Sequence, residues 1–414
     1  MMKIIEKKYY PWVVVALLWV VALLNYMDRQ MLSTMQTPMK ADIHELNQAE
    51  AFGALMAVFL WVYGLVSPFA GMVADKVNRK WLVVGSLFVW SAVTLAMGYA
   101  TSFNQLYYLR GIMGISEALY IPSALSLLAD WHEGKSRSLA IGIHMTGIYM
   151  GQAIGGFGAV VAALLSWKTA FHWFGIIGIV YALVLGMLLH EKPSHGQTLN
   201  VAAQKTAPKA SLLSGFGVVL SNWVFWVILF FFAVPSLPGW ATKNWLPTLF
   251  AQNLGIPMEE AGPISTITIA ASSFLGVILG GSLSDWWVKR HLKGRVYTSA
   301  IGLGMTIPAL VLLGYGHHLS AIVGAGLLFG VGYGMFDANN MPILCQFISA
   351  KQRATAYGIM NMTGVFAGAA VTQVFGKWTD GNQLGAGFAL LGGIVALALV
   401  AQLWFLKPKT DNME

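Results

Sequence analysis

The chain has 414 residues, of which 57% are hydrophobic and only 10% are charged, and its mean hydropathy is +0.65. Soluble domains carry roughly 25% charged residues, so this composition excludes a soluble globular protein and indicates a polytopic membrane protein. The net charge of +8 does not indicate nucleic-acid binding, because the basic residues lie in short loops between apolar segments. The single cysteine, Cys345, excludes an internal disulfide framework.

The N-terminus carries a few basic residues and then a long apolar run that continues through Leu24 into Asn25 and Asp28. A secretory signal peptide would have a short apolar core followed by a cleavage site of small residues. No such site follows this run. We therefore interpret it as a retained first transmembrane helix.

Twelve apolar segments follow one another along the chain, each close to the roughly 20 residues that a helix needs to cross a bilayer. Their expected ranges are 11–36, 50–74, 81–100, 104–129, 138–165, 169–190, 217–250, 261–287, 296–315, 319–348, 354–377 and 385–406. A polar stretch from Glu191 to about Ala210 separates the first six from the last six. We predict an all-α membrane protein with twelve transmembrane helices in two pseudo-symmetric six-helix bundles, residues 1–190 and 216–414, joined by a linker at 191–215.

Most of the lysines and arginines lie in the N-terminus, the linker and the loops that share their side of the membrane. Short loops rich in Lys and Arg stay in the cytoplasm. We therefore expect both termini and the linker to be cytoplasmic. The short loops favour the inner (cytoplasmic) membrane of a bacterium.

Two sequence patterns recur between the halves. Segment 71–75 (Gly-Met-Val-Ala-Asp) recurs as segment 281–285 (Gly-Ser-Leu-Ser-Asp). The pattern that begins at Arg137 and ends in Met-Thr-Gly recurs from Arg353. Internal repeats in a twelve-helix protein indicate two bundles with a binding site between them, near the middle of the membrane.

Two segments hold charges of both signs inside apolar sequence: 25–29 (Asn-Tyr-Met-Asp-Arg) and 110–117, which begins with Arg110 and ends with Glu117. A charge in hydrocarbon costs several kcal/mol, so such residues usually face the interior of a bundle or an aqueous cavity. Arg110 and Glu117 are two helical turns apart and share one face, with Tyr107 on the same stripe. We therefore expect Arg110 and Glu117 to be partners.

Segment 71–80 (Gly-Met-Val-Ala-Asp-Lys-Val-Asn-Arg-Lys) resembles the signature loop of the major facilitator superfamily, with Asn78 where that pattern usually has Gly. Segments 25–29, 110–117 and 244–248 (Asn-Trp-Leu-Pro-Thr) resemble its anion:cation symporter branch, which includes hexuronate, galactonate and sialic-acid transporters and sialin-like carriers. The resemblance implies a monomeric, proton-coupled symporter of a small organic anion that works by alternating access. Its substrate would be a monocarboxylate sugar acid such as a hexuronate, a hexonate or a sialate.

The residue types in these segments suit such a mechanism. The planar guanidinium of Arg29 can bind a carboxylate through two hydrogen bonds. Asp28 and Glu117 can exchange protons, because burial favours a neutral carboxyl and a nearby arginine favours a charged one. The resemblance assigns substrate contact to Arg29 and proton coupling to Asp28 and Glu117, and protonation of the acids would free the arginines for the anion. The alternative is a static ion-pair network that holds the first and fourth helices together.

Further polar residues inside the predicted helices are candidates to line the pocket with Arg29. They are Asn25, Tyr26, Tyr107, Arg110, His144, Tyr149, Gln152, Asp337, Asn339, Asn340 and Asn361. For the Asp337 cluster and for His144 the alternative is a role in helix packing.

Lys243 follows Pro235, Pro238 and Gly239, which are expected to break or bend the seventh helix. Lys243 either attracts anions at the outer mouth of the pathway or extends to the membrane interface, and we favour the interface.

The signature loop also supplies gating candidates. In the superfamily it forms a salt-bridged latch, a role that falls here on Asp75, Arg79 and Lys80, with Asp285 in the second copy. Asp130 and Arg137 are candidates to contribute to the same latch at the next cytoplasmic loop. The alternative is a charge cluster that only sets topology.

The sequence contains no phosphate-binding loop, no cluster with metal-ligand spacing and no nucleophile–base pattern. We therefore expect no cofactor beyond the coupling proton, no enzymatic activity, and no partner beyond the anion and the bilayer. The alternatives within transport are an organophosphate exchanger that pairs Arg29 with Lys243, and a sphingolipid-like or drug exporter. A membrane enzyme or a receptor is a further alternative.

Overall fold

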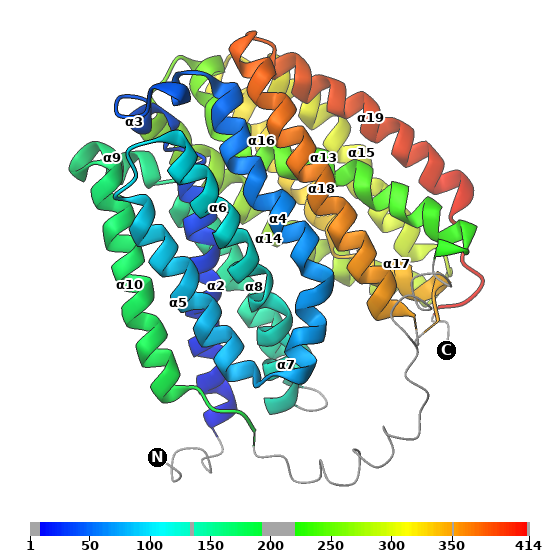
Figure 1. Ribbon diagram of the computed structural model, residues 1–414. Helices are drawn as coiled ribbons and strands as arrows, with labels where there is room; N and C mark the ends of the chain where they lie inside the picture. Colours follow the sequence, from blue (N-terminus) through cyan, green and yellow to red (C-terminus); the bar gives the residue numbers. More distant parts are fainter. Residues whose placement is uncertain (1–8, 133–135, 193–219, 350–351, 412–414) are drawn as a thin grey trace.

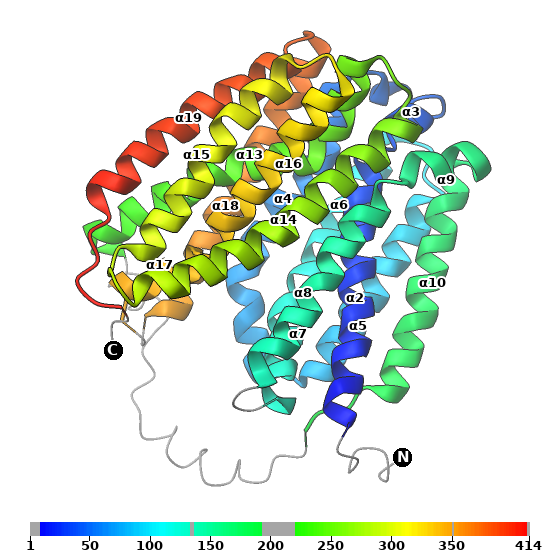
Figure 2. The ribbon, with the colours of Figure 1, turned by 180° about the vertical axis from the view of Figure 1, so that it is seen from behind.

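The computed structural model describes residues 9–132, 136–192, 220–349 and 352–411. Throughout these ranges the regular secondary structure is helical, and no β-strand occurs among them (Figure 1). Figures 1 and 2 show the helices up to α10 and the helices from α13 onward as two groups that lie side by side.

The first group runs from the N-terminus to the segment before the linker. Its helices are α2 (Tyr10–Leu32), α3 (Gln36–Met39), η1 (His44–Asn47), α4 (Ala49–Lys76), α5 (Arg79–Met97), α6 (Phe103–Ala118), α7 (Tyr120–Trp131), α8 (Ser136–Gly155), α9 (Gly158–Leu165) and α10 (Trp167–Leu188).

The second group repeats this order of long helices. Its members are α13 (Trp223–Leu254), α14 (Met258–Val288), α15 (Gly294–Tyr315), α16 (Leu319–Asp337), α17 (Asn340–Phe347), α18 (Arg353–Asp380) and α19 (Leu384–Phe405). The predicted linker, residues 191–215, lies almost entirely outside the described residues, and its boundaries stay a prediction.

Among the described residues, eleven continuous or nearly continuous helical segments are long and apolar enough to cross a membrane. The pair α8 and α9, which is bent by 45°, makes a twelfth span when it is counted as one. The twelve predicted segments agree with these spans to within a few residues at most ends. The chain is therefore a multi-pass, all-α membrane protein built from two six-helix bundles, as predicted.

The fourth span of each half is interrupted near its middle. The first break separates α6 from α7 at Leu119, and the second separates α16 from α17 at Ala338 and Asn339. A proline follows each break within three residues, Pro122 in one half and Pro342 in the other. Proline lacks a backbone N–H and its ring collides with the carbonyl four residues earlier, which explains both breaks. By contrast α13 is continuous through its three prolines, so of the predicted break or bend in the seventh helix the break is absent.

The internal repeat extends to individual hydrogen bonds. Arg137 Nε donates to the carbonyl of His132 (3.2 Å), and Arg353 Nε donates to the carbonyl of Ile348 (3.1 Å). In both cases Nη2 donates to the carbonyl eight residues earlier, at 3.1 and 3.4 Å respectively. Each arginine therefore binds the C-terminal end of the helix before it, where a cation is favourable.

The two groups contact each other on the side of the molecule away from the termini (Figure 1). There α4 packs along α18 and α14 packs against α8 and α9. Ideal Cβ atoms built on Gly53 and Gly64 of α4 would lie about 3 Å from atoms of α18. Because these glycines have no side chain, the two helices approach closely.

Candidate functional site

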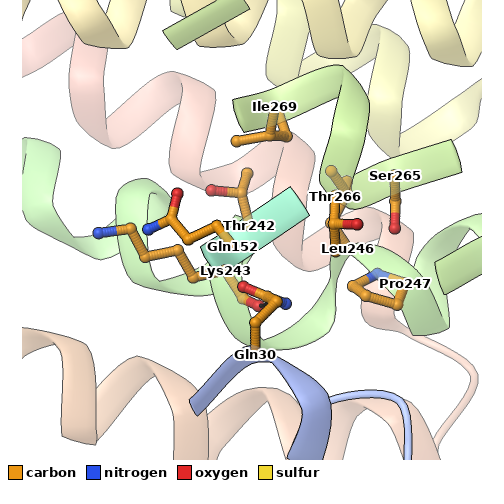
Figure 3. A pocket seen from close by; sticks show the side chains of 9 residues that line it. All are labelled: Gln30, Gln152, Thr242, Lys243, Leu246, Pro247, Ser265, Thr266 and Ile269. Carbon is orange, nitrogen blue, oxygen red and sulfur yellow. Dashed lines mark hydrogen bonds between the residues drawn. The ribbon is translucent and has the colours of Figure 1, made fainter. Parts of the chain in front are cut away.

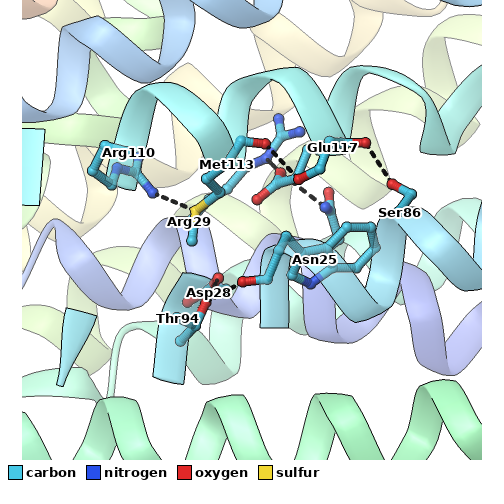
Figure 4. Close-up of polar contacts among 10 residues, drawn as sticks. Asn25, Asp28, Arg29, Ser86, Thr94, Arg110, Met113 and Glu117 are labelled. Carbon is cyan, nitrogen blue, oxygen red and sulfur yellow. Dashed lines mark hydrogen bonds and ion pairs between the residues drawn. The ribbon is translucent and has the colours of Figure 1, made fainter. Parts of the chain in front are cut away.

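A buried ion pair joins the first and fourth spans. Glu117 on α6 is 0% exposed, and its Oε2 accepts hydrogen bonds from Arg29 Nε at 2.5 Å and from Asn25 Nδ2 at 2.8 Å (Figure 4). Both donors lie on α2. The predicted charges of the two segments therefore meet inside the first bundle.

The partner of Glu117 differs from the prediction. We expected Arg110, but Arg110 Nη1 contacts Met113 Sδ at 3.1 Å, and among the described residues no carboxylate lies within 4.0 Å of its guanidinium. Two residues on one face of a helix but two turns apart are about 10 Å apart along its axis. Arg29 reaches Glu117 from a neighbouring helix instead.

Asp28 lies apart from this ion pair. Its Oδ2 accepts a hydrogen bond from Thr94 Oγ1 on α5 at 2.7 Å (Figure 4). It also lines a small space among α2, α5 and α10, together with Trp90 and Phe174. The two predicted proton-coupling acids are thus held in different surroundings, one paired with a cation and one with a hydroxyl.

Four buried polar atoms of this cluster have no hydrogen-bond partner among the described residues. They are Asn25 Oδ1, Arg29 Nη2, Arg110 Nε and Glu117 Oε1. Nearly all buried polar atoms in proteins are paired, so a group of unpaired ones is typical of a functional site. Two of these atoms are guanidinium nitrogens and suit an anionic ligand.

Aromatic rings surround the two arginines. The Arg29 guanidinium lies 5.0 Å from the centre of the Tyr26 ring, 4.7 Å from Phe59 and 4.8 Å from Tyr63. The Arg110 guanidinium lies 4.6 Å from Phe59. Phe59 and Tyr63 were not predicted as site residues. Their spacing of four residues, on a helix next to the charged ones, was the signal that could have found them.

A cavity lies between the two halves beside this cluster. Its volume is about 100 Å³, below the range of about 300–1,000 Å³ typical of drug-sized ligand sites, so it can hold only a small molecule. Four predicted residues line it: Tyr26, Tyr149, Gln152 and Asp337. Thr242, Ser273 and Tyr333 line it as well and were not predicted.

Lys243 also lines this cavity. We favoured an extension to the membrane interface, but the uninterrupted helix α13 directs this residue between the halves. Its ammonium lies 4.8 Å from the centre of the Trp240 ring, and its carbonyl accepts a hydrogen bond from Gln30 Nε2 at 2.8 Å. A second, smaller space is lined by Gln30, Gln152 and Lys243 (Figure 3).

The remaining predicted pocket residues lie outside the lining of this cavity. Asn339 is buried at the break and donates to the carbonyl of Met335 at 2.8 Å, which is a packing contact with the end of α16. Asn340 donates to Asp337 Oδ1 at 3.1 Å and so orients a lining residue. His144 is 0% exposed, with its ring 6.0 Å from that of Tyr120. Its burial on all sides keeps it from the cavity.

Tyr107 and Asn361 lie elsewhere. The Tyr107 ring packs against Phe103 at 5.7 Å between ring centres. Asn361 is partly exposed on α18 and is absent from the cavity lining. The predicted stripe therefore extends along α6 from Tyr107 to Glu117. Only Arg110 and Glu117 belong to the charged cluster.

The gating candidates lie on the side of the termini. Arg79 forms an ion pair with Asp130 on α7, and its backbone N–H donates to Glu191 Oε1 at 2.5 Å. The side chain of Asp75 lies outside the described residues. Asp285 is exposed near the end of α14.

The Lys80 ammonium lies 4.9 Å from the centre of the Trp81 ring. Within the described part of the chain, Arg79 and Lys80 contact the first half and Glu191 at the start of the linker, and neither contacts the second half. Within the described ranges, no three His, Cys, Asp or Glu residues are grouped as metal ligands would be.

Comparison with known proteins gives consistent results. The family model described as Major Facilitator Superfamily matches residues 18–372. The chain is 24% identical over 424 aligned residues to the probable galactarate/D-glucarate transporter GarP of Escherichia coli (strain K12), covering 95% of this chain and 94% of that one. It is also 24% identical to the hexuronate transporter of Bacillus subtilis (strain 168), with the same coverage.

A solved structure of a bacterial homologue of the human lysosomal transporter Spinster, in an inward-facing and occupied conformation, superposes with a TM-score of 0.81. That chain is 18% identical, and the match covers 99% of this chain and 100% of that one. This likeness concerns the fold alone.

Proposed function

Because this chain belongs to the major facilitator superfamily, and is therefore a membrane transporter rather than an enzyme, we propose that it is a proton-coupled symporter of a sugar acid. The observation that carries the proposal is the buried Arg29–Glu117 pair beside a cavity between the halves. A buried charge is costly to keep, and a buried guanidinium with an unpaired nitrogen suits an anionic ligand.

The relatives support the substrate class. The proteins matched over nearly the whole chain are named as carriers of galactarate, D-glucarate and hexuronate. All three are small polyhydroxy acids that are anionic at neutral pH. The cavity offers them the Lys243 ammonium for a carboxylate and hydroxyl or amide groups for the sugar, among them Tyr149, Gln152 and Thr242.

Glu117 is the group that couples the proton to the anion. While its carboxylate is ionised, it holds the Arg29 guanidinium at 2.5 Å and competes with any incoming anion. Protonation removes that negative charge, and Arg29 can then pair with the substrate carboxylate through two hydrogen bonds. The proton and the anion therefore bind together, which is the requirement for symport.

Asp28 is the second candidate to carry a proton. Its hydrogen-bond partner among the described residues is the Thr94 hydroxyl, which donates to the carboxylate and can accept a hydrogen bond from the protonated acid. This arrangement tolerates both protonation states without moving a helix. Asp28 would then act by changing the charge next to Arg29 rather than by touching the substrate.

Alternating access fits the contacts between the halves. These contacts gather on the side away from the termini, where α4 meets α18 and α8 meets α14. With both termini in the cytoplasm, as the positive-inside rule requires, this is the inward-facing conformation in the inner membrane. Separation on that side, and closure of the terminal side, would expose the cavity to the other compartment.

The test is uptake into proteoliposomes of labelled glucuronate, galactonate, galactarate, glycerol phosphate and a neutral sugar. An inward proton gradient is imposed and then collapsed with an ionophore. We expect accumulation of sugar acids that is lost on collapse. Exchange of preloaded glycerol phosphate without gradient-driven uptake would replace this proposal with an anion exchanger, and absence of any sugar-acid transport would refute it.

A further inference from the structure

The cation of the first half has a counterpart in the second half. Arg29 lies on the first span, and its guanidinium is 5.0 Å from the ring of Tyr26, three residues earlier. Lys243 lies on the seventh span, and its ammonium is 4.8 Å from the ring of Trp240, also three residues earlier. Each half therefore places a cation over an aromatic ring on its first helix.

The carboxylate of the first half has a counterpart as well. In the first half, Glu117 lies five residues before Pro122, whose ring interrupts the fourth span. In the second half, Asp337 lies five residues before Pro342, whose ring interrupts the tenth span. Breaks in transmembrane helices commonly form binding sites at the middle of transporters. Lys243 and Asp337 thus repeat the arrangement of Arg29 and Glu117 in the second half.

The two sets differ in how they are paired. In the first half Arg29 and Glu117 are in contact at 2.5 Å. In the second half both Lys243 and Asp337 line the cavity, but they do not form an ion pair within 4.0 Å. Asp337 accepts its hydrogen bond from Asn340 instead, at 3.1 Å. The ammonium of Lys243 therefore faces the cavity without a carboxylate in contact.

Lys243 lies close to the first half. Gln30, the residue after Arg29, donates from Nε2 to the carbonyl of Lys243 at 2.8 Å, so α2 and α13 touch at this point. Figure 3 shows the side chains of Lys243 and Gln152 extending in the same direction. Tyr26 lines the same cavity as Lys243, and its ring centre lies 5.0 Å from the Arg29 guanidinium. A ligand in the cavity would therefore contact Lys243 directly and lie one aromatic ring away from Arg29.

We propose that Lys243 binds a second carboxylate of the substrate, so that the preferred substrates are dicarboxylic sugar acids rather than monocarboxylic ones. This inference rests on the proposed function and specifies its substrate class. One carboxylate pairs with Arg29 in the first half, and the other pairs with Lys243 in the second half. Asp337 is the resident counter-charge of Lys243 in the absence of substrate.

A monocarboxylic sugar acid has no second carboxylate that could pair with Lys243. In galactonate the far end is a primary alcohol, and in galactarate the same carbon is a carboxylate. A charge-assisted hydrogen bond is about twice as strong as a neutral one. The pair of compounds therefore isolates the contribution of Lys243 while the rest of the sugar is unchanged.

The experiment measures binding of galactarate and galactonate to the purified, full-length protein in detergent by isothermal titration calorimetry. The variants are Lys243→Gln, which keeps hydrogen bonding but removes the charge, and Lys243→Arg, which keeps the charge. Lys40→Gln, on an exposed loop, is the control. Thermal unfolding of each variant establishes that it is folded.

We expect the wild-type protein and Lys40→Gln to bind galactarate about tenfold or more tightly than galactonate. Lys243→Gln should lose this preference through weaker binding of galactarate alone, and Lys243→Arg should keep most of it. Equal binding of the two acids by the wild type, or equal weakening of both by Lys243→Gln, would overturn the inference and leave sugar-acid transport intact. Binding of neither acid would overturn the proposed function itself.

Discussion

The contact between Asp380 and α4 gives a quantitative test of how the two halves close. Asp380, the last residue of α18, accepts hydrogen bonds from the backbone N–H groups of Ala49 and Glu50 at 2.8 and 2.9 Å. Both groups belong to the first turn of α4, so a carboxylate from the second half caps a helix of the first half. Lys377 also forms a 3.1 Å ion pair with Glu50.

The expected effect follows from the strength of a helix cap. Replacing an N-cap carboxylate by alanine costs about 1 kcal/mol, within a range of about 0.5–2. The ion pair of Lys377 adds little, because the side chains of Lys377 and Glu50 are 61% and 49% exposed. If the cap exists only while this side is closed, Asp380→Ala shifts the equilibrium about fivefold toward the conformation that is open there.

The assay is labelling of an introduced cysteine by a membrane-impermeant maleimide in intact cells. Cys345→Ala removes the native thiol, and Ala57→Cys places one on the face of α4 that also carries Gly53 and Gly64, which pack on α18. Ala57 is 1% exposed in the closed contact. Labelling therefore reports the fraction of molecules open on this side.

We expect Asp380→Ala to raise the labelling rate about fivefold. Glu50→Gln removes only the ion pair, and the rate should then stay within about twofold of the parent. An unchanged rate in folded Asp380→Ala protein would refute the reasoning. An equal increase in both variants would show that general charge, not the cap, holds this side closed.

Two further predictions concern the arginines. Arg29→Lys should weaken sugar-acid binding about tenfold or more, because an ammonium cannot make the two parallel hydrogen bonds of a guanidinium. Calorimetry would measure the change in affinity. Unchanged affinity would show that Arg29 does not contact the substrate. Arg137→Ala and Arg353→Ala should each destabilise the protein by about 1–3 kcal/mol, because each loses two hydrogen bonds to the end of the preceding helix. Thermal unfolding in detergent would measure both, and a loss in only one half would contradict their equivalence.

The sequence predicted the helices and the repeat well, because both depend on local patterns. The apolar segments give the spans within a few residues, and the repeat from Arg137 to Arg353 corresponds to the same hydrogen bonds in both halves. The breaks after Glu117 and Asp337 were not predicted, although Pro122 and Pro342 were visible in the sequence. A proline near an apolar segment does not by itself decide between a break and a continuous helix, as α13 shows.

The partners within the site could not be predicted from one helix at a time. The spacing of Arg110 and Glu117 put both on one face, but the partner of Glu117 comes from α2, and helix packing decides which cation reaches it. The same applies to Lys243, whose direction depends on the path of α13, and to His144, which the surrounding helices bury completely.

The role of Glu117 is the central claim, and one measurement tests it directly. Uptake of a sugar acid into proteoliposomes is compared for the wild type, Glu117→Gln and Glu45→Gln, a control at an exposed position of the short helix η1. Each protein is measured both under an inward proton gradient and in counterflow without one. We predict that Glu117→Gln loses gradient-driven accumulation but keeps counterflow, because glutamine cannot ionise and leaves Arg29 free for the anion. Gradient-driven accumulation by Glu117→Gln at the wild-type level would contradict the account.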